Sequence, residues 1–327
     1  MKAIVYLKDG SPDDLKLEEV EKPIPADDEV LIKVRAASVN PFDVGTLRHP
    51  FIRRVLSVIS KGKVNQPGRD VAGQVEAIGR NVKRFKPGDA VFGLCGGAFA
   101  EYATASQSAL ALKPDNASFE QAASVPLAGI TALQGLRDKG RLQPGQKVLI
   151  NGASGGVGTF AIQIAKSFGA HVTGVCSPRN VDLARSIGAD ATIDYTREDF
   201  TKDGELYDVI FDVVANHSFS ARQRVLSPKG IYVGAGIVAL GDSMMRLFSH
   251  LITDLVLSRF ASQKFVTLMA KPNQADLTIM RDLMAAGKVT PVIDRCYSLS
   301  EVPEAIRYLE QGHARGKVVI TLEPNAA

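Results

Sequence analysis

Cysteine is scarce in this chain of 327 residues. The three cysteines, Cys95, Cys176 and Cys296, lie far apart in the sequence. They form neither the disulfide framework that staples small secreted domains nor a CxxC metal pair. We therefore expect a protein of a reducing compartment, the cytoplasm.

Long uncharged apolar runs are also missing. The most apolar region, Met244 to Met269, is interrupted by Arg246, Asp254 and Arg259 among others, whereas a helix that crosses a bilayer needs about 20 nearly uncharged residues. Helical spacing between residues 247 and 258 predicts a helix packed on the core or at a subunit contact. Contact with a membrane surface is the less favoured alternative. The first ten residues lack a signal-peptide core, and we expect a strand there.

Blocks of basic residues are absent. Lys and Arg total 39 against 35 Asp and Glu, a formal net charge of +4, and the basic residues are scattered. A protein that tracks a phosphate backbone concentrates them. Nucleic acid is therefore not an expected partner.

The length predicts two domains, and 45% hydrophobic residues provide for a large core. Up to about Leu112 the chain has short alternating segments divided by Pro and Gly, which is typical of a β-rich lobe. After Pro126 it repeats strand, turn and helix, as a parallel sheet covered by helices requires. The predicted fold class is α/β. We expect a first domain over residues 1–122, a nucleotide-binding domain over 123–266, and a return to the first domain over 267–327.

The element boundaries follow from the same patterns. The expected strands are Ala3 to Leu7, Val30 to Arg35, Val71 to Ile78, Ala90 to Phe92, Glu101 to Ala103, Lys147 to Ile150, His171 to Val175, Ala191 to Asp194, Val209 to Val213, Gly230 to Val233 and Lys317 to Leu322. The expected helices are Thr159 to Phe168, Asn180 to Ile187, Ala221 to Leu226, Gln274 to Ala286 and Val302 to Gln311.

A glycine turn is the clearest functional motif. Residues 147–158, KVLINGASGGVG, run from an apolar strand through a GxxGxxG turn into an amphipathic helix. Such a turn lets the backbone approach a pyrophosphate while the first N–H groups of the helix face its charge. We predict a dinucleotide site; the alternative is a tight turn without a ligand. The residues assigned to it are Gly152, Ser154, Gly155, Gly156, Val157 and Gly158.

The end of the next strand predicts which dinucleotide binds. After His171 to Val175 come Cys176, Ser177, Pro178 and Arg179, and no carboxylate appears before Asp182. A carboxylate at that strand end would chelate the ribose hydroxyls, whereas a hydroxyl and a guanidinium attract a 2′-phosphate. We therefore predict NADPH, with Ser177 and Arg179 on the 2′-phosphate and Tyr195 beside it. The alternative for Arg179 is a solvated residue at a helix start.

Several motifs together resemble the medium-chain dehydrogenase/reductase superfamily, and within it the zinc-free quinone oxidoreductase and enone reductase branch. The resemblance covers nearly the whole chain. The motifs are ASVNPFD (37–43), PGRDVAGQVEAIG (67–79), FKPGDAVF (85–92), PLAGITAL (126–133), the glycine turn, and HARGKVVI (313–320). The resemblance implies a GroES-like β-rich catalytic domain, a Rossmann domain, an active site between them, and a homodimer.

Departures from the zinc-dependent alcohol dehydrogenases predict chemistry without a metal. The positions of the catalytic cysteine and histidine ligands are occupied by the runs Asn40 to Asp43 and Gly68 to Asp70, and the four-cysteine structural loop is missing. A zinc site of Cys and His cannot form from these residues. Cys95 is interpreted as a small buried residue.

The resemblance also implies site residues. It places Asn40 and Thr131 at the nicotinamide half of the cofactor as catalytic residues, and it places Phe265, His313, Ala314, Arg315 and Lys317 around the cofactor. The alternatives are a turn cap for Asn40, a helix-interior hydroxyl for Thr131 and a surface turn for Arg315. Asp43 is either a carboxylate in the active site or a charge at a helix N-terminus.

Two functions fit these residues. In the first, the protein is a zinc-independent reductase that transfers hydride from NADPH to a small-molecule quinone or α,β-unsaturated carbonyl, whose own oxygen takes up the negative charge. In the second, it is an NADPH-binding scaffold or membrane-associated regulator with little turnover. The sequence does not identify the acceptor or a proton donor.

Overall fold

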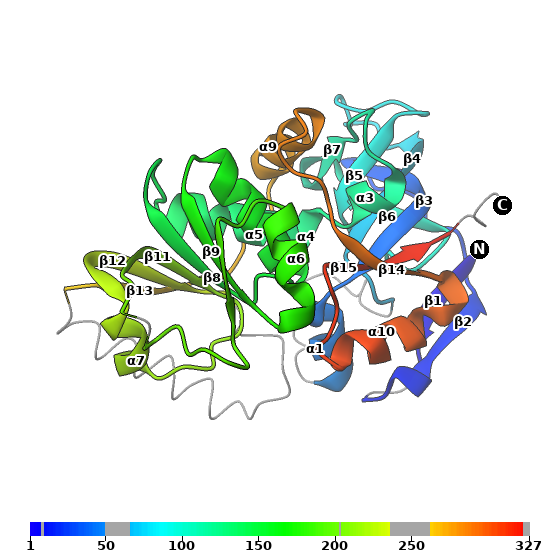
Figure 1. The fold of residues 1–327 in the computed structure, drawn as a ribbon. Helices are drawn as coiled ribbons and strands as arrows, with labels where there is room; N and C mark the ends of the chain where they lie inside the picture. Colours follow the sequence, from blue (N-terminus) through cyan, green and yellow to red (C-terminus); the bar gives the residue numbers. More distant parts are fainter. Residues whose placement is uncertain (8–9, 50–65, 203, 236–261, 323–327) are drawn as a thin grey trace. The chain divides into compact units, whose positions relative to one another are not determined.

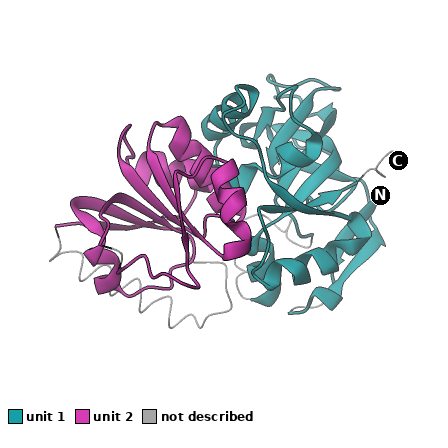
Figure 2. Ribbon diagram, in the orientation of Figure 1, with its two compact units in different colours: residues 1–130, 272–327 teal, residues 131–271 magenta. Residues whose placement is uncertain are grey.

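The chain forms two compact units (Figure 2). The computed structural model describes residues 1–7, 10–49, 66–202, 204–235 and 262–322. Unit 1 comprises Met1–Ile130 and Pro272–Ala327, and unit 2 comprises Thr131–Lys271. The C-terminal segment belongs to unit 1, and the two boundaries between the units lie eight and five residues later than residues 122 and 266.

Unit 1 is built on a mixed, mainly antiparallel sheet of seven strands (Figure 1). Its order is β14 (Ile293–Ser298), β15 (Lys317–Thr321), β3 (Glu29–Val39), β4 (Asp70–Ile78), β5 (Ala90–Leu94) and β7 (Leu110–Leu112), with β6 (Tyr102–Ser106) paired to β3. A separate hairpin joins β1 (Lys2–Tyr6) and β2 (Leu15–Glu19). The C-terminal strand β15 pairs with β3, so strands from both ends of the sequence belong to the same sheet.

The helices described in unit 1 are α1 (Pro41–Arg48), α3 (Phe119–Ala123), α4 (Pro126–Gln134, which continues into unit 2), α9 (Gln274–Ala285) and α10 (Val302–Glu310). Two of them, α3 and α9, begin at a residue whose side chain caps the helix. Ser118 and Asn273 accept backbone N–H groups at the starts of α3 and α9, which satisfies donors that a helix start leaves free.

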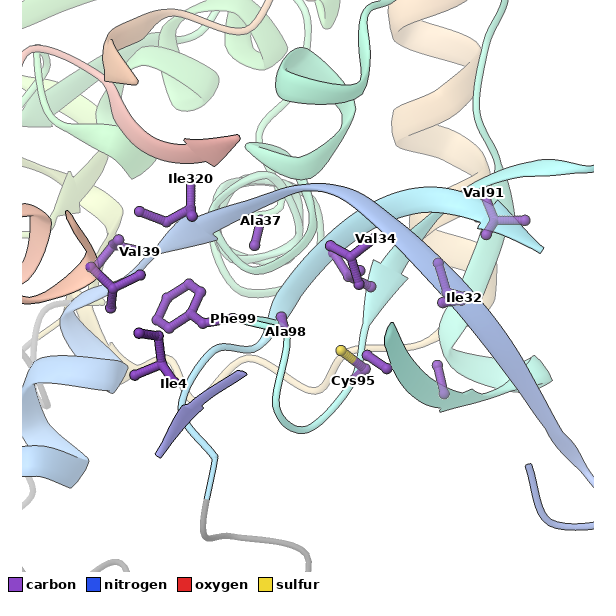
Figure 3. Close-up of a cluster of buried hydrophobic side chains, with 14 of the residues drawn as sticks. Ile4, Ile32, Val34, Ala37, Val39, Val91, Cys95, Ala98, Phe99 and Ile320 are labelled. Carbon is purple, nitrogen blue, oxygen red and sulfur yellow. The ribbon is translucent and has the colours of Figure 1, made fainter. Parts of the chain in front are cut away.

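The core of unit 1 fills the space under β3, β4 and the β1 hairpin. Figure 3 shows part of this cluster, including Ile4, Phe99 and Ile320. The carbonyl of Phe99 accepts the Ile4 N–H at 2.8 Å. Cys95 belongs to the same cluster, and burial raises the pKa of its thiol to about 12. The interpretation of Cys95 as a buried packing residue is confirmed.

Unit 2 is a six-stranded parallel sheet. Its order is β10 (Ala191–Asp194), β9 (His171–Cys176), β8 (Lys147–Asn151), β11 (Tyr207–Asp212), β12 (Leu226–Gly234) and β13 (Lys264–Thr267). α5 (Gly156–Ser167) packs on β8 and β9, α6 (Val181–Ser186) on β9 and β10, and α7 (Phe219–Arg224) on β12. Numbered within the unit, this order is 3-2-1-4-5-6, with the switch point beside β8, which is the doubly wound arrangement that binds dinucleotides.

The strand β8 of unit 2 has an apolar, buried centre. Val148, Leu149 and Ile150 are all fully buried, as expected for a parallel strand covered on both faces. The expected strands and helices of the described residues are present, with ends shifted by up to four residues; α5, for example, begins at Gly156 instead of Thr159. The helix expected at 221–226 ends at Arg224, because Leu226 already begins β12. The helix expected at 180–187 begins one residue later, after a 3-10 turn at Pro178–Asn180. Strands β2, β7, β13 and β14 and helices α1, α3 and α4 were not among the expected elements.

No helix among the described residues is long and apolar enough to cross a membrane. The helix expected between residues 247 and 258 lies outside the described residues.

Candidate functional site

The glycine turn between β8 and α5 has a backbone that side chains would block. Gly152 has a φ of +85°, and a Cβ at this position would lie 2.5 Å from Cγ2 of Val213. A Cβ on Gly158 would lie 2.1 Å from the carbonyl oxygen of Gly152. Both glycines are therefore required for the turn to close onto α5 and onto the end of β11.

The start of α5 presents donors to an anion. Gly155 precedes the helix and has no side chain to cap it, so the N–H groups of the first turn, from Gly156 to Gly158, have no partner inside the helix. A Cβ on Gly155 would meet only one atom, at an ordinary 3.5 Å, which leaves open space on this side of the turn. Backbone donors without a partner in the helix, the positive end of a helix and glycines without side chains together fit a pyrophosphate.

The end of β9 carries hydroxyl and guanidinium groups. β9 ends at the buried Cys176, and the half-buried Ser177 and exposed Arg179 follow. Tyr195 follows β10, its N–H donates to the carbonyl of Cys176 at 3.3 Å, and its side chain is 60% exposed. Because β9 and β10 are adjacent and parallel, their carboxyl ends bring Ser177 and Tyr195 to the same edge of the sheet. Asp194, at the end of β10, is bonded to Thr196.

A buried carboxylate shapes the loop that follows β11. Oδ1 of Asp212 accepts from Nδ2 of Asn151 at 2.9 Å and from the N–H groups of Val214 and Ala215 at 2.9 and 2.8 Å. Its Oδ2 accepts from the Tyr232 hydroxyl at 2.9 Å. These bonds hold Ala215 at a φ of +57°, a conformation that non-glycine residues rarely adopt. Asp212 thus fixes a loop at the carboxyl edge of the sheet, beside Gly152.

Asn40 lies in a buried polar network of unit 1. Its Oδ1 accepts from Nζ of Lys317 at 2.7 Å, and its Nδ2 donates to Oδ2 of Asp70 at 3.0 Å and to the carbonyl of Ser38 at 3.3 Å. Nζ of Lys317 also lies 3.5 Å from Oδ2 of Asp70. Both hydrogens of the Asn40 amide are therefore engaged, and the side chain offers other groups only acceptor capacity at Oδ1.

The network also neutralises a fully buried carboxylate. Oδ2 of Asp70 accepts from the Ser38 hydroxyl at 2.8 Å, and Oδ1 accepts from the Leu127 N–H at 3.0 Å. Burial lowers the pKa of Lys317, and the nearby Asp70 and Asp43 partly oppose this effect. A buried carboxylate and a buried ammonium each require a partner of opposite charge. Lys317, Asn40 and Asp70 are thus mutually dependent.

Comparisons with known proteins agree with this arrangement. A family model described as alcohol dehydrogenase GroES-like domain matches residues 26–115, and one described as zinc-binding dehydrogenase matches residues 187–320. The chain is 35% identical to the chloroplastic quinone-oxidoreductase QR1 of Triphysaria versicolor, with 95% of each protein covered. It belongs to the quinone oxidoreductase branch of the medium-chain dehydrogenase/reductase superfamily.

The chain is also similar to a 2-methylene-furan-3-one reductase and to a solved quinone oxidoreductase. The chain is 37% identical to the 2-methylene-furan-3-one reductase of Solanum lycopersicum, over 98% of this chain and 79% of that protein. Its fold matches the solved structure of the quinone oxidoreductase from Coxiella burnetii with a TM-score of 0.85 and 31% identity, over 99% of each chain. The GroES-like and Rossmann domains of this superfamily correspond to the observed units 1 and 2, and its enzymes are nicotinamide-dependent oxidoreductases.

The remaining site residues expected from the superfamily are distributed over both units. Thr131 is half-buried in α4. His313 and Arg315 are exposed in the turn between α10 and β15, where the Arg315 N–H donates to Oδ2 of Asp294 at 2.9 Å, and Ala314 packs against the core of unit 1. Phe265 lies in β13, with its ring centroid 4.2 Å from that of Phe219 and 5.5 Å from that of Tyr232. Their roles at the cofactor stay predictions.

Asn40 and Asp70, which lie in the two runs that depart from the zinc-dependent enzymes, hydrogen-bond to each other. Asp70 is engaged by Ser38, Asn40 and Leu127, and no group of three or more His, Cys, Asp or Glu side chains in the described parts of the chain is placed to hold a metal ion.

Sequence reasoning missed the residues that hold the site together. Asn180, Asp212 and Asp70 are buried and hydrogen-bonded to predicted site residues or to the loops that carry them. A polar residue directly at the end of an apolar strand, as in VIFD at 209–212, was the available signal.

Asp43 is a buried residue in the first turn of α1, next to the network of Asn40, Asp70 and Lys317. Its Oδ2 accepts the Asn40 N–H at 2.8 Å. Burial raises the pKa of Asp43 from 3.8 to about 7; the Asn40 N–H opposes this, Asp70 adds to it and Lys317 opposes it. The folded state therefore keeps its proton to higher pH than the unfolded state. Between about pH 4 and pH 7 the free energy of unfolding should fall as pH rises because of this group.

The variant Asp43→Asn keeps an acceptor for the Asn40 N–H and removes the charge. We expect it to be more stable than the wild type at pH 8, by up to about 4 kcal/mol, and equally stable near pH 4. Urea unfolding from pH 4 to pH 8 measures both values. A gain that persists unchanged at pH 4 would contradict the assignment of the effect to the Asp43 charge.

Proposed function

We propose that the protein is a zinc-independent, NADPH-dependent reductase that transfers hydride to a quinone or an α,β-unsaturated carbonyl. The observation that carries the choice of cofactor is the end of β9, where Ser177 and Arg179 stand and a ribose-chelating carboxylate does not. Relatives of the same branch are named quinone oxidoreductase and 2-methylene-furan-3-one reductase, which supports the class of acceptor.

The chain's own residues bind and orient the cofactor. The N–H groups at the start of α5 receive the pyrophosphate, and Arg179 and Ser177 receive the 2′-phosphate through charge-assisted bonds. The Val213 to Asn216 loop, held by Asp212, borders the glycine turn. When bound, the nicotinamide ring supplies a hydride.

The catalytic groups proposed are Asn40 and Thr131. In a quinone or enone the substrate's own oxygen takes up the negative charge as hydride arrives, so the reaction does not require a Lewis acid. Because the Asn40 amide hydrogens are bonded to Asp70 and Ser38, we assign Asn40 the role of an acceptor that orients a hydroxyl of cofactor or substrate.

An activity screen tests this function. The loss of NADPH absorbance is followed with 1,2-naphthoquinone, acrolein and a long-chain enone, with and without a chelator. We expect turnover that a chelator does not reduce. If NADPH raises the melting temperature while no acceptor is consumed, the protein is a nucleotide-binding scaffold and the proposal of a reductase is wrong.

Arg179→Glu tests the choice of cofactor. Losing a charge-assisted bond and adding a repulsive carboxylate should raise the KM for NADPH about 100-fold, since such a bond contributes about 1.5–3 kcal/mol, and should leave the KM for NADH nearly unchanged. Arg185→Glu, the same charge change on an exposed residue of α6, is the matched control. Equal effects of the two variants would reject the 2′-phosphate site.

We also propose a cytoplasmic homodimer. β13 is an edge strand of the unit 2 sheet, and edge strands are places where a second copy can pair. Light scattering of the purified protein measures the molecular mass, and a monomer at micromolar concentration would contradict the dimer.

A further inference from the structure

Asn180 joins two segments of the dinucleotide site. Its side chain is 4% exposed. Nδ2 donates to Oγ of Ser154 in the glycine turn at 2.9 Å and to Oγ of Ser177 after β9 at 3.1 Å. The two hydroxyl oxygens therefore lie within about 6 Å of each other.

The direction of these bonds determines what the hydroxyls can do. An amide nitrogen only donates, so both serines act as acceptors toward Asn180, and each keeps its own O–H hydrogen for another group. In the described part of the chain neither hydroxyl donates to a protein acceptor. Two O–H donors this close together, with Arg179 directly before Asn180 in the sequence, fit a phosphate monoester.

The other end of the amide argues against a purely structural role. Oδ1 of Asn180 is buried and has no hydrogen-bond partner among the described residues. An unpaired buried acceptor costs free energy. A residue selected for stability alone would have hydrogen bonds at both Nδ2 and Oδ1. The arrangement is better explained by the orientation that Nδ2 imposes on the hydroxyls of Ser154 and Ser177.

Building on the proposed function, we propose that Asn180 is the positioning residue that turns the hydroxyls of Ser154 and Ser177 outward as paired donors to the 2′-phosphate of NADPH. Asn180 does not touch the phosphate. It acts by donating to the oxygen of both hydroxyls, which leaves their hydrogens for the phosphate. Ser154 of the glycine turn and Ser177 after β9 then contribute together to the preference for a 2′-phosphate.

Direct binding of nucleotide fragments tests this role without turnover. Isothermal titration of the full chain with 2′,5′-ADP and with 5′-AMP gives an affinity ratio that reports the 2′-phosphate alone. We expect Asn180→Ala to lower this ratio about tenfold, and Asn180→Asp to lower it about 100-fold. Aspartate offers only acceptors, so both hydroxyls would turn inward toward it, and its charge repels the phosphate.

Stability and coupling complete the test. Asn180→Ala should leave the melting temperature of the ligand-free protein close to that of the wild type, because the lost bonds are offset by removal of the unpaired Oδ1. In the double variant Ser177→Ala/Asn180→Ala, the affinity ratio should fall by less than the sum, in free energy, of the effects of the two single variants. The matched control, Asn116→Ala, removes an amide bonded to the carbonyl of Met284 in unit 1 and should not change the ratio.

The outcomes separate the two proposals. If the wild type binds 2′,5′-ADP no better than 5′-AMP, the assignment of NADPH fails. If the wild type shows the preference but both Asn180 variants keep it, or lose affinity for both fragments equally together with stability, then Asn180 has only a structural role.

Discussion

Gly158→Ala is expected to weaken dinucleotide binding about 100-fold. The added Cβ would lie 2.1 Å from the Gly152 carbonyl oxygen and 2.8 Å from two backbone atoms of Ala153. All three are main-chain atoms that cannot rotate away, so the turn and α5 must separate. A displacement of this kind should cost at least about 3 kcal/mol, which corresponds to a loss of cofactor affinity of about 100-fold. Titration with NADPH and urea unfolding measure the two effects.

Gly155→Ala is the matched control in the same turn. Gly155 has a φ of −80°, which alanine adopts without strain, and its Cβ would meet only the Gly152 carbonyl at 3.5 Å. We expect this variant to fold with the stability of the wild type. Equal stability of the two variants would mean that Gly158 is not a close-packing position.

Lys317→Met should produce a large loss of stability in unit 1. The methionine fills the space of the lysine stem, but it leaves the buried Asp70 without its cation and Oδ1 of Asn40 without its donor. Removing one partner of a buried ion pair costs about 3–5 kcal/mol. Activity should fall as well, because the Asn40 amide loses the bond that orients its oxygen. Urea unfolding and steady-state kinetics measure these losses.

A second substitution and a surface control distinguish this effect from general damage. Lys317→Met/Asp70→Asn removes both charges and should recover a large part of the lost stability but not the activity. Lys147 is also the first residue of a strand, and its ion pair with Glu205 is solvent-exposed. Lys147→Met should therefore change the free energy of unfolding by less than about 1 kcal/mol. A similar loss in both lysine variants would reject the importance of the buried network.

The elements with strong local patterns were predictable, and those formed by pairing were not. The glycine turn and the apolar centre of β8 have sequence signals that depend on adjacent residues only. β13 and β14, by contrast, are partly exposed along their length, and they are strands because they pair with β12 and β15. Similarly, Leu226 begins β12 instead of ending α7 because it pairs with Tyr207.

The site shows the same division. Ser177 and Arg179 were identified from the strand that precedes them, since a ligand of a parallel sheet binds at the carboxyl ends of its strands. Asn180 has no such signal, because its importance lies in contacts with two loops. For Asn40 the resemblance implied only a place at the nicotinamide half of the cofactor, whereas the bonds to Asp70 and Ser38 show that its amide has only acceptor capacity left.

The sequence by itself determined the α/β class, the position of the glycine turn and the absence of an acidic residue after β9, because each depends on residue types at short spacing. Only the tertiary structure decided that Lys317 pairs with Asn40 and Asp70, which lie more than 240 positions away in the chain. It also decided that Asn180 holds both serines. Burial makes such long-range partners obligatory, since a polar group removed from water must find a partner wherever the fold brings one near.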